Sequence, residues 1–308
     1  MFDKLFVRQA IDRSAENGLD RRRFLHSAGV AGLGVAAAGA ISTGLISEAS
    51  AAGPSDGAVL NFALNLEYLE AEFYLRAVHG TGLPSTAIDG KGTPGKVSGG
   101  RKVNFKNKVI QQFATEIAAD ELAHVKFLRA ALGSAKVARP AIDIDAAFTA
   151  AATAAGLIKP GQKFDAYAND DNFLLAAFVF EDVGVTAYKG AAPLISNKTY
   201  LEAAAGILAV EAYHAANIRT TLLNRGLATP SRAISDARDS LDGSTDLDQG
   251  LNRLDTANII PTDANGIAFS RSAGQVLNVV YLNPAMVKKG GFFPNGVNGE
   301  INTSAKSN

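Results

Sequence analysis

The chain has 308 residues, and its 30 Lys plus Arg balance its 30 Asp plus Glu, so the formal net charge at pH 7 is zero. This balance and the lack of a basic stripe argue against nucleic acid as a partner. Cysteine is absent, which excludes disulfides, thiolate metal sites and a cysteine nucleophile. Abundant Ala and Leu, together with the absence of Trp, favour an all-α fold.

Residues 1–51 have the features of an export signal that is removed. Arg21 and Arg22 are followed by x-Phe-Leu, a weakly apolar Gly/Ala-rich run and the small-x-small site Ala49-Ser50-Ala51. The pattern resembles a twin-arginine signal, whereas a membrane anchor or core helix would be richer in Leu and Ile. We therefore expect a periplasmic or extracellular protein with no membrane span in its mature form. The expected mature parts are a bundle over 52–229 and an extension over 230–308.

The first expected helix runs from Ser55 or Asp56 to His79. At about 100° per residue, Glu67 and Tyr74 share one line on it and Glu70 lies nearby, while Glu72 points to the opposite side. The Gly/Pro/Ser-rich residues 80–102 indicate a surface loop, either a lid over a site or, in our preferred interpretation, a tolerated insertion.

The second expected helix runs from about Asn104 to Leu132. Glu121 and His124, three residues apart, project from one face and can bind one metal ion. The following 35 or so residues contain a short helix near 144–155 and are long enough to carry the chain back along a bundle. The sequence thus favours one long crossover between the second and third helices.

The third and fourth helices are expected over about 169–191 and 199–225, joined by a short link. They repeat the pattern of the first pair: Glu181 aligns with Glu67, and Glu211-x-x-His214 aligns with Glu121-x-x-His124. Asp182 is turned away from Glu181 and is expected to pair with an arginine. Gly184 either permits close helix packing, which is our preferred interpretation, or leaves space beside the metal for a small ligand. Asp120 precedes His124 by four residues, but its counterpart before His214 is Val210, so we do not select Asp120 as a ligand.

The order Glu, Glu-x-x-His, Glu, Glu-x-x-His is the ligand arrangement of dinuclear carboxylate bundles. Buried Glu and His more often serve hydrogen-bond networks, but four buried carboxylates without a cation would be costly, which favours a metal. Four residues near the predicted ligands also occupy matching places in the two halves of the sequence. They are two tyrosines, expected mainly as core aromatics, and two arginines, expected as salt-bridge partners. The predicted metal ligands are Glu67, Glu121, His124, Glu181, Glu211 and His214, and the predicted neighbours of the site are Glu70, Tyr74, Tyr188, Arg129 and Arg219.

The segments LNFALNLEYLEAEFYLRA, FEDVGVTAYKG and GGFFPNGVNG resemble the desiccation-related branch of the ferritin-like proteins. The resemblance implies a ferritin-like four-helix bundle with one long crossover and two iron or manganese ions, whereas the long loop and the C-terminal extension depart from the compact ferritin subunit. It further implies a small oxygen species or metal ions as partners, with oxidation of ferrous iron or removal of peroxide as the reaction, and it is compatible with a homo-oligomer. The alternative is a non-catalytic, stress-related scaffold with the same fold. Within the extension, short helices are expected after residues 230 and 271, and the paired phenylalanines Phe292 and Phe293 are expected to dock onto the same chain.

Overall fold

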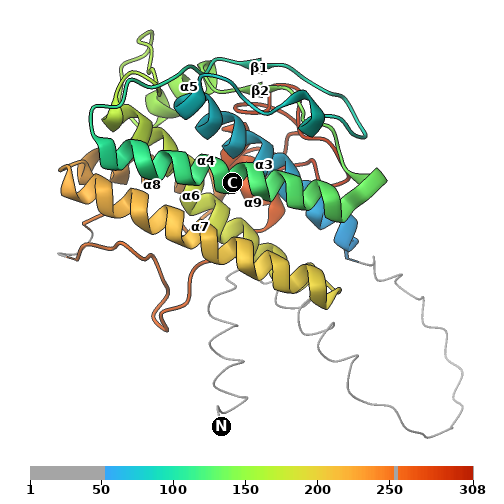
Figure 1. Cartoon of the computed structure of the whole chain (residues 1–308). Helices are drawn as coiled ribbons and strands as arrows, with labels where there is room; N and C mark the ends of the chain where they lie inside the picture. The colour runs from blue at the N-terminus through green and yellow to red at the C-terminus, as the bar shows by residue number, and fades with distance from the viewer. Residues whose placement is uncertain (1–52, 253–255, 308) are drawn as a thin grey trace, which may run out of the picture.

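The computed structural model describes residues 53–252 and 256–307 and is a helical bundle (Figure 1). The all-α four-helix bundle expected from the sequence is confirmed. The predicted export signal over residues 1–51 lies outside the described residues. Four long helices form the bundle: α3 (Asp56–His79), α4 (Lys108–Leu132), α6 (Asp170–Ala191) and α7 (Lys198–Asn224).

Each long helix begins at a polar side chain that accepts hydrogen bonds from the first turn, at Ser55, Asn107, Asn169 and Asn197. The predicted start of the second helix near Asn104 is wrong. Asn107 has extended backbone, and its side chain accepts from the backbone nitrogen of Val109 at 2.8 Å, so the helix begins four residues later than expected. The other three helices begin and end within one residue of the prediction.

Hydrogen bonds at the helix starts establish the topology. Asp170, at the start of α6, accepts from the backbone nitrogen of Asn107 at 2.9 Å, so α4 and α6 begin at the same end of the bundle. Asp56, at the start of α3, accepts from the backbone nitrogen of Ser196 at 2.8 Å, so α3 and α7 begin together at the other end. The single long crossover between α4 and α6 contains the short helix α5 (Ala146–Ala154). Figure 1 shows α4 and α7 running side by side in opposite directions.

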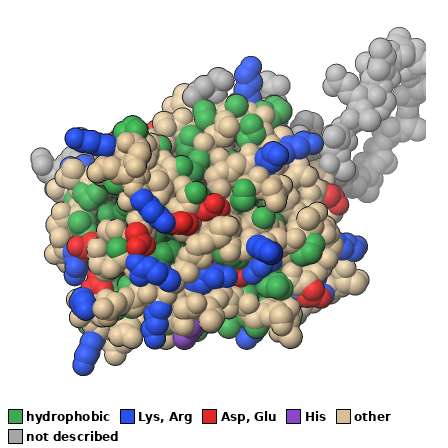
Figure 2. All heavy atoms as spheres, turned by 90° about the horizontal axis from the view of Figure 1, so that it is seen from above, with side chains coloured by type: hydrophobic (Ala, Val, Ile, Leu, Met, Phe, Trp, Pro, Cys, Tyr) green, Lys and Arg blue, Asp and Glu red, His purple; other side chains and the backbone are tan. Residues whose placement is uncertain are grey.

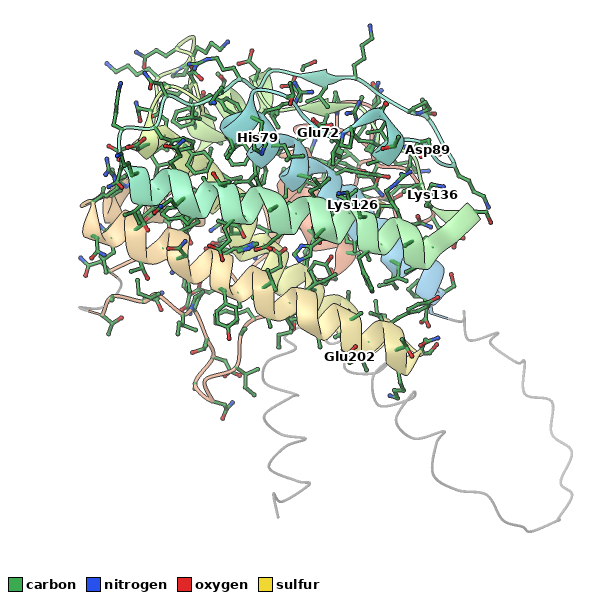
Figure 3. The ribbon with its side chains drawn as sticks, in the orientation of Figure 1. Glu72, His79, Asp89, Lys126, Lys136 and Glu202 are labelled. Carbon is green, nitrogen blue, oxygen red and sulfur yellow. The ribbon has the colours of Figure 1, made fainter. Side chains whose placement is uncertain are left out.

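The loop over residues 80–102 lies along the outer side of α3 and the end of α4. Its short strand β1 (Val97–Ser98) pairs in parallel with β2 (Ile142–Asp143) of the crossover, and Asp89 accepts from Arg129 on α4 through its backbone oxygen at 2.7 Å. Figure 3 shows Asp89 and Glu72 on this side of the molecule, where Glu72 pairs with Arg139 and with Arg76. These contacts pack the loop and the crossover against the face of α3 that carries Glu72.

The C-terminal extension packs against the bundle through α8 (Ala228–Asp242), α9 (Ala273–Tyr281) and the loop that follows. Phe292 and Phe293 are completely buried, and the ring of Phe292 lies 4.9 Å from that of Phe180 on α6 and 5.1 Å from that of Phe148 on α5. The expected docking of these two phenylalanines onto the same chain is thus confirmed.

The surface seen in Figure 2 carries Lys and Arg side chains with Asp, Glu and apolar side chains between them. This face therefore shows no broad patch of a single charge. Among the residues that the structure describes, no helix is both long and apolar enough to cross a membrane.

Candidate metal centre

The six predicted ligands come together in the interior of the bundle, and all six are buried. Their ligand atoms form two groups, each with atoms within 4.8 Å of one another, and the two groups share Glu121. Glu211 joins only the first group. The first group contains Glu67, Glu121, His124 and Glu211, and the second contains Glu121, Glu181 and His214.

Both imidazoles present Nδ1 to the carboxylates. In the first group, Nδ1 of His124 lies 3.2 Å from Glu67 and 3.7 Å from both Glu121 and Glu211. In the second group, Nδ1 of His214 lies 3.3 Å from Glu121 and 3.6 Å from Glu181. The repeated Glu-x-x-His pattern thus produces two similar half-sites because α3 with α4 and α6 with α7 form equivalent helix pairs.

The two predicted tyrosine neighbours are buried aromatics, and both also donate hydrogen bonds to ligands. Tyr188 on α6 donates to Oε1 of Glu67 on α3, and Tyr74 on α3 donates to Oε1 of Glu181 on α6. The expectation that they act mainly as core aromatics therefore misses half of their role. Each hydroxyl binds one oxygen of its carboxylate, while the other oxygen faces a histidine.

Glu70 lies beside the two groups without joining either, and it is 6% exposed. A Cβ atom at Gly184 would lie 3.5 Å from Oε1 of Glu70 and would overlap Oε2 of Glu211. Gly184 on α6 thus permits the close approach of a side chain from the neighbouring helix α7, and that side chain is Glu211. The glycine leaves room for the Glu211 carboxylate, which a Cβ atom at this position would displace.

The electrostatics of the cluster fit a bound cation. Both carboxylate oxygens of Glu121 and of Glu211 are buried without a hydrogen-bond donor, and so is Nδ1 of His214. Such orphaned groups carry a desolvation cost that metal coordination would remove.

The protonation equilibria point to the same need for positive charge. Burial raises the pKa of Glu67 to about 7 and holds the pKa of Glu70 and of Glu211 well above their usual range. Burial also opposes the charged forms of the histidines, but the surrounding carboxylates outweigh it and raise the pKa of His124 to about 10 and that of His214 to about 12. Protons thus supply the positive charge that a divalent ion would supply on the same atoms.

Comparison with known proteins assigns the fold to a family. The family model for the ferritin-like domain matches residues 55–224 of the sequence. The chain belongs to the ferritin-like family. It is similar to the desiccation-related protein PCC13-62 of Craterostigma plantagineum, with 34% identity over 72% of this chain and 76% of the relative. It is also similar to the ferritin-like catalase Nec2 of Nesocodon mauritianus, with 29% identity over 79% of this chain and 83% of the relative. No solved structure shows significant similarity.

The two predicted arginine neighbours lie outside the carboxylate cluster of this ferritin-like bundle. Arg129 donates to the hydroxyl of Tyr68 at 2.6 Å and pairs with Asp89. Arg219 pairs with Asp182 at 2.6 Å, as the sequence analysis expected for that carboxylate. Since Tyr68 and Asp182 each follow a predicted ligand, the arginines brace equivalent places in the two halves.

Sequence reasoning missed one partner of the ferritin-like centre. Asp120 Oδ2 lies 3.1 Å from Nε2 of His214, the ring nitrogen that faces away from the carboxylates. Asp120 was set aside because Val210 occupies the equivalent place on α7, and that comparison tests only whether it is a ligand. Its partner is on a different helix, so no spacing along the sequence could reveal the contact.

Proposed function

We propose that the chain binds two iron or manganese ions and uses them to remove hydrogen peroxide after its export from the cytoplasm. The observation that carries the proposal is the buried cluster of orphaned carboxylate and imidazole atoms, organised as two groups joined by Glu121. The similarity of the chain to a ferritin-like catalase favours peroxide over ferrous iron as the substrate.

The donor set assigns each half-site its own ligands. Glu67, His124 and Glu211 would hold one ion, Glu181 and His214 would hold the other, and Glu121 would lie between them. Carboxylate and imidazole ligands suit iron and manganese, and a redox-active pair of these ions would supply a store for two electrons. One peroxide is oxidised to dioxygen and gives up two electrons and two protons, and a second peroxide takes them up and becomes two waters.

The protein's own residues would order the ligands and hold protons. Tyr74 and Tyr188 fix the outer oxygens of Glu181 and Glu67, so that only the inner oxygens face the metal positions. Glu70 is beside the cluster and joins neither ligand group, and burial raises the pKa of its carboxyl in the metal-free protein. It is the group best placed to accept and return protons during the two half-reactions.

Export and a protective role complete the proposal. The twin-arginine pattern over residues 1–51 supports a periplasmic or extracellular location, and such signals suit a protein whose metals are inserted before export. The similarity to a desiccation-related protein supports a role under stress. The same similarity favours a second candidate function, a non-catalytic protective scaffold, because that relative's name specifies no reaction.

The first experiment is elemental analysis of the exported protein, purified without added metal or chelator, followed by measurement of dioxygen evolution from peroxide. We expect about two iron or manganese ions per chain and release of one dioxygen for every two peroxides. The variant Glu121→Ala/Glu211→Ala should lose the metals and at least about 100-fold in rate while remaining helical by circular dichroism. Glu116→Ala, at an exposed position on the same helix, is the matched control and should retain both.

Three outcomes separate the candidate functions. A folded wild-type protein that takes up no metal would reject the dinuclear site and favour the non-catalytic scaffold. A protein with two ions that neither evolves dioxygen from peroxide nor oxidises ferrous iron would reject catalysis but retain metal binding. Rapid oxidation of ferrous iron without removal of peroxide would show that ferrous iron is the substrate, and the proposed metal site would stand.

A further inference from the structure

We propose that Asp120 strengthens one of the two metal positions by orienting His214, so that its removal weakens binding at the position formed by Glu181 and His214 and leaves the position formed by Glu67, His124 and Glu211 unchanged. The inference rests on the proposed two-metal site and goes beyond it by assigning to one half a supporting carboxylate that the other half lacks. The observation behind it is the contact of 3.1 Å between Asp120 Oδ2 and His214 Nε2.

The contact fixes which nitrogen of His214 is available to a metal. With the Nε2 proton donated to Asp120, the lone pair is on Nδ1, which faces Glu121 at 3.3 Å and Glu181 at 3.6 Å. A carboxylate on the far nitrogen also holds the ring plane and increases the basicity of the coordinating nitrogen. Both effects strengthen coordination, and neither requires Asp120 to touch the metal.

The other half-site lacks this device. The place equivalent to Asp120 is Val210, four residues before His214, and its side chain can accept no hydrogen bond. Among the described residues, the hydrogen bond of His124 is made by Nδ1, to Glu67, and none is made by Nε2. The two halves share the reciprocal tyrosines. They differ in their ligands, because Glu211 joins only the His124 group, so the contribution of Asp120 is measured by removing it at each position and not by comparing the two affinities.

The size of the effect follows from exposure. Removal of such an outer carboxylate typically costs about 10- to 100-fold in metal affinity. The Asp120 side chain is 42% exposed, so water competes for it and weakens the contact. We therefore expect a loss near the lower end, about tenfold, confined to one of the two positions.

The test measures Mn²⁺ binding to metal-free mature protein by calorimetry, with electron paramagnetic resonance to distinguish isolated from paired ions. Asp120→Ala should weaken one binding step about tenfold and leave the other unchanged. Glu116→Ala removes an exposed carboxylate one turn earlier on α4 and should change neither step. Circular dichroism checks that each variant remains helical.

Two single-site backgrounds identify the affected position. In a His124→Ala chain, which retains the His214 position, Asp120→Ala should lower the affinity for Mn²⁺ about tenfold. In a His214→Ala chain, which retains the His124 position, the same change should have no effect.

Equal losses in both backgrounds, or no loss in either, would overturn the inference while leaving the two-metal site in place. A wild-type protein that binds no Mn²⁺, Fe²⁺ or Co²⁺ would instead reject the proposed function, and this inference with it.

Discussion

Gly184 shows how a residue without a side chain shapes the centre. It lies on α6 one turn beyond Glu181, and its missing Cβ leaves space for Oε2 of Glu211 from α7. A helical glycine costs up to about 1 kcal/mol of stability relative to alanine. The site thus retains a locally unfavourable residue because the carboxylate of a neighbouring helix needs the volume.

Replacement of this glycine is predicted to harm metal binding without harming the fold. Gly184→Ala should displace the Glu211 carboxylate and weaken Mn²⁺ binding by at least about tenfold, as measured by calorimetry. Gly206→Ala is the matched control, because a Cβ at that helical position on α7 meets no neighbouring atom. It should raise the free energy of unfolding by up to about 1 kcal/mol and leave the metal content unchanged. Equal metal affinities in the two variants would contradict this role for Gly184.

At the scale of elements, a buried ion-pair network joins the extension to the bundle. Asp182 on α6 accepts from Arg219 on α7 at 2.6 Å and from Arg238 on α8 at 3.0 Å. Arg238 also pairs with Asp248, which in turn pairs with Arg271 at 2.6 Å. Burial raises the pKa of Asp248, but the two guanidinium groups outweigh that effect and lower it. The network makes α8 and the following loop an integral layer of the molecule.

Breaking the network at Asp182 is therefore expected to be severe. Asp182→Ala leaves two buried arginines with less compensation and should lower the free energy of unfolding by about 3–5 kcal/mol, as measured by urea denaturation. The control is Asp171→Ala near the start of the same helix, where the pair with Arg225 is 44% and 32% exposed and its removal should cost about 0–1 kcal/mol. Similar losses in the two variants would show that the buried network adds no more than a surface pair.

At the scale of the whole molecule, the stability of the metal-free protein should fall as the pH rises from about 4.5. Burial raises the pKa of Glu67 from its ordinary 4.5 to about 7, so the folded state binds more protons than the unfolded state in this window. Glu181 and Glu211 are shifted in the same direction by the same cause. His124 adds the same sign at higher pH, because stability from its proton is complete below pH 6.5 and is lost as the pH rises towards 10.

Glu121 does not reverse this trend. Burial raises its pKa, but the two imidazoles outweigh burial and lower it to about 2, so its contribution is present above pH 4.5 and is lost only on acidification. It therefore adds no slope in the window where Glu67 titrates.

Metal binding is predicted to oppose the loss of stability at rising pH. The ligands must release their protons to bind an ion, so affinity should increase between pH 5 and pH 8. The difference in melting temperature between Mn²⁺-loaded and metal-free protein should widen over this range, and a 100-fold excess of ion over the dissociation constant adds about 2.7 kcal/mol. The Glu121→Ala/Glu211→Ala variant should show no such difference at any pH. A constant difference in the wild type would mean that the buried carboxylates do not exchange protons for metal.

The sequence alone determined the helices, the crossover and the candidate ligand set. Asn and Ser caps, apolar periodicity and the repeated Glu-x-x-His spacing are local signals, because residues three or four apart on one helix share a face whatever surrounds them. The one misplaced helix start, at Asn107, lies next to a loop whose apolar residues blur the boundary. The metal-binding role of the six ligands itself stays a prediction.

Only the tertiary structure decided which groups meet across helices. The contact of Asp120 with His214, the reciprocal bonds of Tyr74 and Tyr188, and the space that Gly184 leaves for Glu211 all depend on the axial alignment and rotation of neighbouring helices. That alignment is set by the packing of the whole core, and a shift of one residue on either helix would break each of these contacts. The sequence therefore determined which side chains each helix contributes, and the packing of the bundle determined how those side chains are paired.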